Sequence, residues 1–509
     1  MTDLLVDQLR DMAAAYPDET AYTLADTGES LTFRAWDAGS NRLARGLVAA
    51  GVGHGDRVGI HLPGTALIAW ITAYPAIHRA GAVAVPVNTR LHADELAAIL
   101  RHAGVSVVLT STDLRGSIDR IAERLPDLRT VLVADGGTEP FAPDLDDDDT
   151  PFQVPVRGDD LADIMYTSGT TGTPKGVAVR HDNLALVGPR APSFGGRAWM
   201  HGSPLFTFAG IGFIFNPMKL GMAGLYLAQF DAGAWFDHVE RHRPTAVFLV
   251  PAMAKLLVAH PRFASADLTS LSICAIGSAP LAFETLKAVQ QKLPDAIVTN
   301  GYGMTEAGAA YCVLPPGEGL RRPGSVGHPV PPTEVRVVDR HDADVPTGDE
   351  GEILLRTGAR QRSYYRDPEA TARTWSGGWL HTGDIGRLDE DGYLYVVGRI
   401  KDVIIRGGHN VHAGDVEEVL HQHTGVLDAA VVGIAHEVLG EDVAAAVVPL
   451  AGHVLDPEEV IAFCRARLAD YKSPRTVVVV DELPRNATGK VLKRELVARF
   501  EARPAARTP

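Results

Sequence analysis

Hydroxyl side chains, glycines and one lysine are concentrated in residues 167–177, TSGTTGTPKGV. Glycine lets neighbouring backbone N–H groups converge on an anion, the hydroxyls add donors, and Lys175 adds positive charge. Lys175 follows a proline and precedes a glycine, so the segment is not a Walker A loop. We predict a phosphate-binding turn after an apolar strand, although composition alone also fits a flexible structural turn.

A second group of potential ligands lies in residues 300–306, NGYGMTE. The apolar run before it predicts a strand that leads into a turn. Tyr302 offers an aromatic face to a purine ring, Thr305 a hydroxyl to phosphate, and Glu306 the hard carboxylate oxygen that Mg²⁺ prefers. Because similar turns also serve purely structural purposes, this segment indicates a nucleotide site only together with others.

Three more residues have side chains suited to a nucleotide. In residues 379–386, WLHTGDIG, we predict that Asp384 lies in a turn, where its two oxygens can accept both hydroxyls of a ribose. Arg399 in GRIKD can approach the same nucleotide, and Lys490 follows a glycine in the loop RNATGKVLK. Taken singly, each also fits a turn cap or a solvated surface charge.

The elements that must position these residues are layered strands and helices. Apolar runs such as LADIMYT, TSLSICAIG and DAIVTNG lead into glycine-rich turns, and helix-like stretches such as AFETLKAVQQKL separate them. In doubly wound sheets ligands bind beyond the carboxyl ends of the strands, where these motifs stand. Residues 335–357 have strand-like runs broken by turn residues and predict a small β-rich subdomain.

The character of the sequence changes near Gly398. The segment GRIKDVIIRGGHN is charged and glycine-rich, and beyond it helix-like and strand-like segments alternate as far as Leu496. We predict a large N-terminal domain of layered α/β subdomains, residues 1–398, followed by a small, mobile α+β C-terminal domain, residues 399–509. The last residues are expected to fray.

Length and charge narrow the function classes. A chain of 509 residues can bury several cores, and its net charge of -15 disfavours nucleic-acid and anionic membrane partners. The three cysteines have no ligand-like spacing and predict buried thiols: Cys274, Cys312 and Cys464. Residues 1–20 do not resemble a signal peptide, and residues 67–77 are too short to span a bilayer. We expect a cytoplasmic enzyme that is not an integral membrane protein.

In their order along the chain, the motifs resemble those of the superfamily that contains acyl-CoA synthetases, peptide-synthetase adenylation domains and firefly luciferase. TSGTTGTPKGV is similar to the phosphate loop, GYGMTE to the adenine and Mg²⁺ motif, WLHTGD to the ribose motif, GRIKD to the hinge, and PRNATGKVLKREL to the catalytic-lysine motif. The resemblance covers nearly the whole chain. It implies that a carboxylate attacks the α-phosphorus of MgATP, releasing pyrophosphate, and that CoA then displaces AMP.

The resemblance also implies roles for individual residues. Lys490 would bridge the carboxylate and the α-phosphate, with Glu306 on Mg²⁺ and Thr305 at the phosphates. The other nucleotide-binding residues would be Thr167, Ser168, Gly169, Thr170, Thr171, Lys175, Gly277, Ser278, Ala279, Asn300, Gly301, Tyr302, Gly303, Met304, Asp384 and Arg399. Rotation of the C-terminal domain between the two steps would use a hinge at Lys401 and bring Gly407 and Gly408 to the CoA tunnel.

In relatives the acyl pocket is lined by segments that correspond here to residues 206–215, 251–255, 275–280 and 301–311. Only Glu306 and Lys255 in these segments are charged, so we expect a hydrophobic acid, either a fatty chain or a bulky ring system. The expected pocket residues are Thr207, Phe208, Gly210, Pro280 and Gly308. Close backbone packing without any pocket also explains the small residues.

Two departures from the family pattern affect these expectations. Thr207 stands where relatives commonly have histidine, and Phe208 could take over the gating role by a shift of one residue. Ala413 and Asp415 replace a proline and a glutamate that are frequent before the next helix, which bears on details of the thioester-forming arrangement.

Competing functions within the same resemblance remain open. One is a ligase that transfers its acyl-adenylate to a carrier protein; the discriminator is whether free CoA is consumed. Another is a non-catalytic acyl or nucleotide sensor, which would be expected to have lost Lys490 or Glu306, whereas both are present. No sequence feature supports luciferase-like light emission. The identity of the acid and the oligomeric state, homodimer included, are not determined by the sequence.

Overall fold

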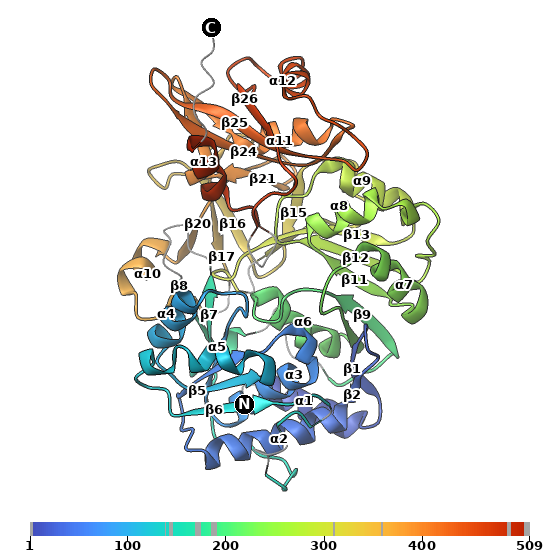
Figure 1. Cartoon of the computed structure of the whole chain (residues 1–509), viewed down its shortest axis with the longest axis vertical. Coiled ribbons are helices and arrows are strands. Elements are labelled where there is room, and N and C mark those ends of the chain that lie inside the picture. Colours follow the sequence, from blue (N-terminus) through green and yellow to red (C-terminus); the bar gives the residue numbers. More distant parts are fainter. Residues whose placement is uncertain are drawn as a thin grey trace.

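The computed structural model describes residues 4–137, 139–141, 146–167, 175–184, 191–308, 311–357, 360–485 and 490–502. A large body contains the N-terminus, and a smaller domain at the top of Figure 1 contains the last helix, α13 (Lys493–Glu501). The predicted α/β architecture, with a large first domain and a small second one, is confirmed.

The first sheet is mostly parallel and carries the predicted phosphate segment near one edge. Its strands lie in the order β18 (Ser363–Tyr364), β8 (Lys175–Arg180), β7 (Leu161–Thr167), β4 (Val83–Pro86), β3 (Arg57–His61), β5 (Val105–Ser111) and β6 (Thr130–Ala134). β8 runs antiparallel to β7 and to β18, so the chain returns beside its own strand at that edge.

The second sheet begins with a parallel part that resembles the first in construction. Its order is β2 (Ser30–Thr32), β1 (Thr20–Leu24), β10 (Met222–Tyr226), β9 (Arg197–His201), β11 (Ala246–Leu249), β12 (Ile273–Gly277) and β13 (Ile297–Gly303). From β10 to β13 neighbouring strands are parallel, so their carboxyl ends meet at one edge. The GYG segment belongs to the end of β13 itself.

Helices pack between and around the two sheets. Every residue of α3 (Leu67–Arg79) is buried, because the helix lies in a core that includes Ile60 of the first sheet and Tyr226 of the second. The other helices of this body are α1 (Leu5–Ala15), α2 (Phe33–Ala49), α4 (Ala93–Ala103), α5 (Arg115–Asp119), α6 (Phe208–Lys219), α7 (Ala232–His242), α8 (Pro251–Ala259), α9 (Phe283–Lys292) and α10 (Pro368–Thr374).

The expected β-rich segment is present, but it is hydrogen-bonded into the second sheet. β14 (Tyr311–Val313) and β15 (Ser325–Pro329) connect β13 to β21 (Leu394–Arg399), β20 (Trp379–Leu388), β17 (Gly351–Arg356) and β16 (Glu334–Val338), and β19 (Trp375–Ser376) pairs with β20. This continuity carries the predicted ribose residue towards the end of β13.

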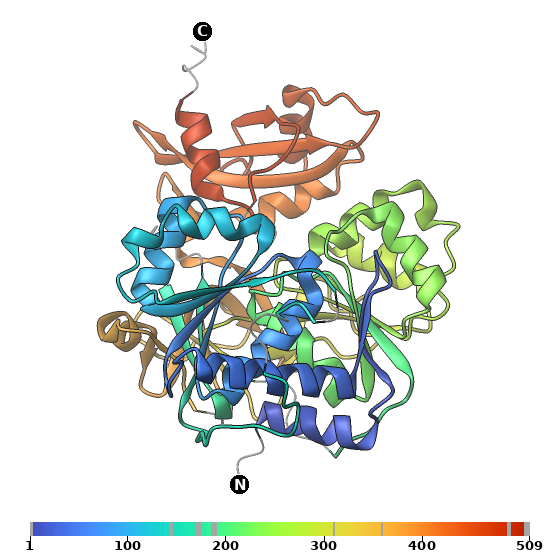
Figure 2. The same cartoon turned by 60° about the horizontal axis from the view of Figure 1, so that its bottom comes forward.

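The C-terminal domain is built on a long antiparallel pair, β24 (Val426–His436) and β25 (Gly440–Pro449). β22 (Val403–Arg406), β23 (His409–His412) and β26 (Thr476–Val479) complete the sheet. α11 (Ala413–His421) and α12 (Pro457–Arg465) share one core with it, and Leu496 of α13 packs in another. Figure 2 shows this domain lying over the N-terminal body.

Two further expectations can be compared with the described residues. The three cysteines are free and buried, as predicted. Within the described part of the chain, no helix combines the length and apolar character needed to cross a bilayer.

Candidate active site

The carboxylate of Glu306 lies where two strands from different sheets end. Glu306 follows β13, and the hydroxyl of Thr167, the last residue of β7, donates to its Oε1 at 3.4 Å. Tyr364 of β18 donates its hydroxyl to the same oxygen at 3.3 Å. Both hydrogen bonds are long, so this carboxylate is held only loosely by protein donors.

Tyr364 also brings Lys175 to Glu306. The ammonium of Lys175 lies 4.9 Å from the centre of the Tyr364 ring, within the range of a cation–π contact. Burial, and then the charge of Glu306, raises the pKa of Tyr364, so its hydroxyl remains a donor. Thr167 and Lys175 pair across β7 and β8, which places the two ends of the phosphate segment side by side. Ser168, Gly169, Thr170 and Thr171 lie outside the described residues.

Asp384 is buried, and its carboxylate accepts a hydrogen bond on one oxygen and forms an ion pair through the other. Tyr302 donates its hydroxyl to Oδ2 at 2.7 Å, and Arg399 Nε lies 2.9 Å from Oδ1. The prediction of a turn here was wrong: Asp384 lies within β20, paired with Arg399 of β21, directly after Gly383 with φ of +70°. Burial, and then the charge of Asp384, raises the pKa of Tyr302.

Lys490 comes from the C-terminal domain to the same region. Its pKa is lowered, first by burial of the ammonium and then by Arg399, while Asp384 and Glu306 act in the opposite direction. The residue as a whole keeps an exposed side. The structure therefore brings Lys490 within electrostatic reach of three other residues that sequence reasoning assigned to the nucleotide.

The two segments predicted to surround adenine lie at the carboxyl ends of neighbouring strands, β12 and β13. Gly277 of β12 pairs with Gly301 of β13, and a Cβ on Gly277 would lie 3.0 Å from the Gly301 carbonyl oxygen. Ser278 is exposed and adopts a φ of +74°, a conformation that non-glycine residues rarely adopt away from functional sites. Asn300 is buried and donates to the Ser325 carbonyl at 3.4 Å. Ala279 and Met304 follow these strands, and Gly303, the last residue of β13, is exposed.

Thr207 and Gly210 have structural roles at the start of α6. Thr207 is the N-cap residue: its hydroxyl accepts from Gly210 N at 3.0 Å and donates to the Pro204 carbonyl at 2.7 Å. A Cβ on Gly210 would lie 2.1 Å from that carbonyl oxygen. Close backbone packing therefore explains Gly210. Phe208, between these two residues, has a half-buried aromatic side chain that packs against the core.

A buried cation lies against Phe208, which was not expected from the pocket segments. Arg362 Cζ is 4.6 Å from the centre of the Phe208 ring, and the residue is 3% exposed. Gly308 lies beside it, since a Cβ on that glycine would be 2.8 Å from Arg362 Nε. Pro280, another expected pocket residue, is exposed at the end of the β12 segment.

The hinge and tunnel residues form the entry to the C-terminal domain. Lys401 is exposed in a short 3₁₀ helix, Ile400–Asp402, that follows Arg399 directly. Gly407 and Gly408 form the turn between β22 and β23, with φ of +57° and +84°. Two positive φ angles in a two-residue hairpin turn are a sufficient structural reason for both glycines.

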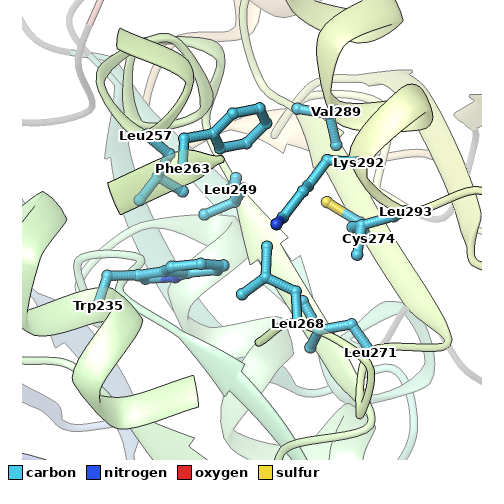
Figure 3. A pocket seen from close by; sticks show the side chains of 10 residues that line it. All are labelled: Trp235, Leu249, Leu257, Phe263, Leu268, Leu271, Cys274, Val289, Lys292 and Leu293. Carbon is cyan, nitrogen blue, oxygen red and sulfur yellow. The ribbon is translucent and has the colours of Figure 1, made fainter. Parts of the chain in front are cut away.

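A small apolar pocket lies elsewhere and does not correspond to the site. It measures about 10 Å³ and is lined by core side chains around Trp235, Leu249 and Cys274. Figure 3 shows the Lys292 side chain extending among them, and its ammonium donates to the Ala264 carbonyl at 2.8 Å. A space of this size holds at most one water, so the cavity is a packing defect of the core.

Sequence reasoning missed Tyr364 and Arg362. Both stand in residues 360–366, RQRSYYR, which contain no glycine-rich turn and no apolar run. Ser363 of β18 pairs with Ala178 of β8, so this segment meets the phosphate strand across a long stretch of sequence. The only signal in the sequence was an arginine and a tyrosine separated by one residue. This pattern does not indicate a functional site unless the pairing of β18 with β8 is known.

Known protein families and individual proteins match this chain over most of its length. Residues 9–365 match the family described as AMP-binding enzyme, and residues 415–490 match the AMP-binding enzyme C-terminal domain. A feruloyl-CoA synthase of Amycolatopsis sp is 38% identical over 480 residues, which cover 93% of this chain and 94% of that protein.

Two other similar proteins differ in their acid or acceptor. A fatty acid–[acyl-carrier-protein] ligase of Streptomyces coeruleorubidus is 33% identical, covering 93% of this chain and 92% of that protein. The solved structure of an anthranilate CoA ligase in complex with anthranoyl-AMP superposes with a TM-score of 0.88 at 28% identity, covering 99% of this chain and 98% of that one.

Proposed function

Because the chain belongs to the AMP-binding enzyme family, we propose that it is an AMP-forming acyl-CoA synthetase acting on a hydrophobic carboxylic acid. The observation that carries this proposal is the meeting of Glu306, Asp384 and Arg399 with Lys490 of the C-terminal domain. Side chains of both charge signs, contributed by two domains, suit a reaction that joins two anions.

In the first step, a carboxylate oxygen of the acid attacks the α-phosphorus of ATP. The bond between the α-phosphorus and the bridging oxygen breaks, and pyrophosphate leaves with the electron pair. Lys490 would hold the carboxylate and the α-phosphate together, since its ammonium offers three donors and a positive charge. Asp384 would accept the ribose hydroxyls, and Arg399 and Tyr302 keep its carboxylate in place.

The residues around Glu306 fit a magnesium ion bound together with nucleotide phosphates. Mg²⁺ is usually held by one or two carboxylates and substrate phosphates, not by an all-protein cage. Glu306 supplies one carboxylate, and the described residues contain no cluster of three or more metal-ligating side chains. Bound there, the ion would neutralise phosphate charge, while Thr167 and Tyr364 orient the carboxylate.

In the second step, the thiolate of CoA attacks the carbonyl carbon of the acyl-adenylate. The acyl C–O bond breaks, AMP leaves with that oxygen, and the thiol proton goes to solvent. We propose that the C-terminal domain turns about Lys401 between the steps, because the residue that acts first and the expected CoA-facing turn, Gly407 and Gly408, belong to the same domain.

The acid is proposed to be aromatic or fatty. Phe208 is the large apolar side chain at the start of α6, and the two relatives named above act on a phenylpropenoic acid and a fatty acid. The positive charge of Arg362 is directed at backbone carbonyls, so it does not by itself require a second carboxylate on the acid.

The test is to incubate the protein with MgATP, CoA and a panel of fatty, cinnamic and benzoic acids and to identify products by mass spectrometry. Formation of an acyl-CoA and AMP with at least one acid supports the proposal. Absence of both acyl-AMP and acyl-CoA with every acid, from folded protein, contradicts it.

The similarity to a carrier-protein ligase favours one second candidate, in which the acyl group passes to a phosphopantetheine thiol on a protein. The same incubation separates the two. Acyl-AMP that accumulates with CoA present, and that disappears when a holo acyl carrier protein is added, would replace CoA by a carrier protein as the acceptor.

A further inference from the structure

Arg362 is a buried cation that joins three segments of the proposed active site. Its Nη1 donates to the carbonyl of Thr305 at 2.5 Å, and its Nη2 donates to the carbonyl of Asn183 at 2.6 Å. The guanidinium carbon lies 4.6 Å from the centre of the Phe208 ring. One planar group thus contacts the turn that carries Glu306, the segment after the phosphate strand, and the first residue of α6.

The charge of this guanidinium has no close counterion among the described ion pairs. Burial lowers the pKa of Arg362 to about 10, and Asp163 and Glu306 partly oppose this effect, so the group stays charged at neutral pH. Asp163 is already engaged by Tyr74 at 2.7 Å and His78 at 3.0 Å. Burying a cation is costly, so a side chain kept here by packing alone would more easily be apolar.

Gly308 supplies an independent sign that the position of Arg362 is constrained. Gly308 has a φ of +63°, and a Cβ on it would lie 2.8 Å from Arg362 Nε and 2.7 Å from Asn183 Oδ1. Neither of those two polar atoms has a hydrogen-bond partner in the described structure. The guanidinium therefore packs so closely against Gly308 that a side chain at this position would not fit.

These contacts determine how Phe208 and the Thr305–Glu306 turn are placed relative to each other. In the proposed reaction, Phe208 would contact the acid and Glu306 would act at the phosphates, so their separation sets where the carboxylate meets the α-phosphorus. A displacement of about 1 Å between reacting groups can reduce a rate about 100-fold. A planar fork that holds two carbonyls and a ring together provides that alignment.

We propose that Arg362 is a positioning residue for adenylation, which aligns the acid-binding wall at Phe208 with the Thr305–Glu306 turn. The inference rests on the proposed function and adds to it a residue outside the motifs that define the site. It predicts that loss of Arg362 affects use of the acid more strongly than binding of ATP.

The experiment measures acid-dependent ATP–pyrophosphate exchange for Arg362→Met, Arg362→Lys and a matched control, Arg360→Met. Arg360 lies two residues away, and its exposed side chain pairs with Asp182 at 3.2 Å. We expect R362M to lower kcat/KM for the acid about 100-fold, with the KM for ATP changed less than about threefold. R362K should have a kcat/KM for the acid about tenfold higher than R362M, because lysine keeps the positive charge but cannot hold two carbonyl groups in the fixed geometry of a guanidinium.

A double-mutant cycle with Phe208→Leu tests whether the two residues act together. If Arg362 works through Phe208, R362M combined with F208L should be little worse than R362M alone. The inference would be overturned if the losses in kcat/KM of the two single variants multiplied in the double variant. It would also be overturned if R362M and R360M had similar kcat/KM values for the acid, or if R362M changed only the KM for ATP. If R362M does not fold, R362K decides, since a kcat/KM for the acid equal to wild type would overturn it.

Failure of the inference remains distinguishable from failure of the proposed function. Wild-type protein that exchanges pyrophosphate with no acid of the panel contradicts the proposed function. Active wild-type protein with unaffected Arg362 variants contradicts only the positioning role.

Discussion

Two polar clusters connect the C-terminal domain to the N-terminal body, and they differ in whether their residues belong to the predicted nucleotide motifs. The nucleotide cluster consists of Glu306, Asp384, Arg399 and Lys490. The interface cluster consists of Lys255 on α8 and three residues of the C-terminal domain, His421, Asp428 and Arg485. Both cross the boundary between the domains.

In the interface cluster the protein groups contact one another directly. Lys255 Nζ lies 3.1 Å from His421 Nδ1 and 3.7 Å from Asp428 Oδ1, and Arg485 Nη2 lies 2.5 Å from Asp428 Oδ2. Burial, and then the charge of Lys255, lowers the pKa of His421 to about 4, so its ring is neutral and accepts from the ammonium.

In the nucleotide cluster Arg399 pairs with Asp384 at 2.9 Å, and the ammonium of Lys490 is subject to charges of both signs from three residues. That arrangement suits a group that must meet several ligand anions in succession. The comparison suggests that the nucleotide cluster performs chemistry, whereas the interface cluster only stabilises one orientation of the C-terminal domain. If so, breaking the first should remove a reaction step, and breaking the second should shift the balance between steps.

The largest effect is expected for Lys490→Ala. Without the ammonium, acid-dependent ATP–pyrophosphate exchange should fall at least about 100-fold, because two anions must meet without a cation between them. Thioester formation from supplied acyl-AMP and CoA should be spared. The matched control is Lys472→Ala, which removes another lysine of the same domain, paired with Asp415 at 2.6 Å. Equal loss of both half-reactions would contradict the role given to Lys490.

A smaller loss is expected for Asp384→Asn. Removing the charge breaks the ion pair with Arg399 and weakens the proposed hydrogen bonds from the ribose, and hydrogen bonds to charged groups are worth about 1.5–3 kcal/mol. We expect the KM for ATP to rise at least about tenfold at saturating acid, with Tyr302→Phe causing a lesser rise. An unchanged KM for ATP in D384N would remove Asp384 from the nucleotide cluster.

Asp428→Asn tests the interface cluster. It removes the negative charge that faces Lys255 across the domain boundary, so the observed domain orientation should lose about 0.2–1 kcal/mol of stability, the range of exposed ion pairs. Thioester formation from supplied acyl-AMP should then rise about two- to fivefold relative to pyrophosphate exchange. Asp18→Asn, which breaks an exposed pair with Arg34, is the control. An unchanged ratio in D428N would show that this contact does not influence the domains.

The smallest effect concerns pH. With the domains in contact, the pKa of His421 is about 4, and with the domains apart it should return towards the ordinary value near 6.5. The separated arrangement therefore binds the extra proton, and the contact loses stability as pH falls from 6.5 towards 4. Between pH 7 and about 6.2 the ratio of the half-reactions should shift about twofold towards thioester formation. His421→Gln should abolish this shift. If H421Q showed the same pH profile as the wild-type protein, His421 would not be the group responsible.

The sequence was most informative where the site is contiguous. Glu306 and Asp384 stand in short motifs whose residue types already indicate their ligands, and the alternating apolar runs indicated the layered fold. Tyr364 and Arg362 could not be found in this way, because their partners are reached only through the pairing of β18 with β8. The interface cluster draws on α8, α11, β24 and a late loop, and no local pattern links these segments. The turn predicted at Asp384 was wrong, because the strand β20 continues through Gly383, whose positive φ coincides with a shift in the register of β20 against β17.

The pairing of Asp384 with Arg399 has a consequence for the order of events. Arg399 is the last residue of β21, and Lys401 follows two positions later. If the second domain turns about Lys401, as proposed, Asp384 and Arg399 would stay with the N-terminal body while Lys490 would move away. The acyl-adenylate would then stay bound through its ribose during the rotation. Its dissociation into solvent would depend on the strength of these ribose contacts and not on the rate of the rotation.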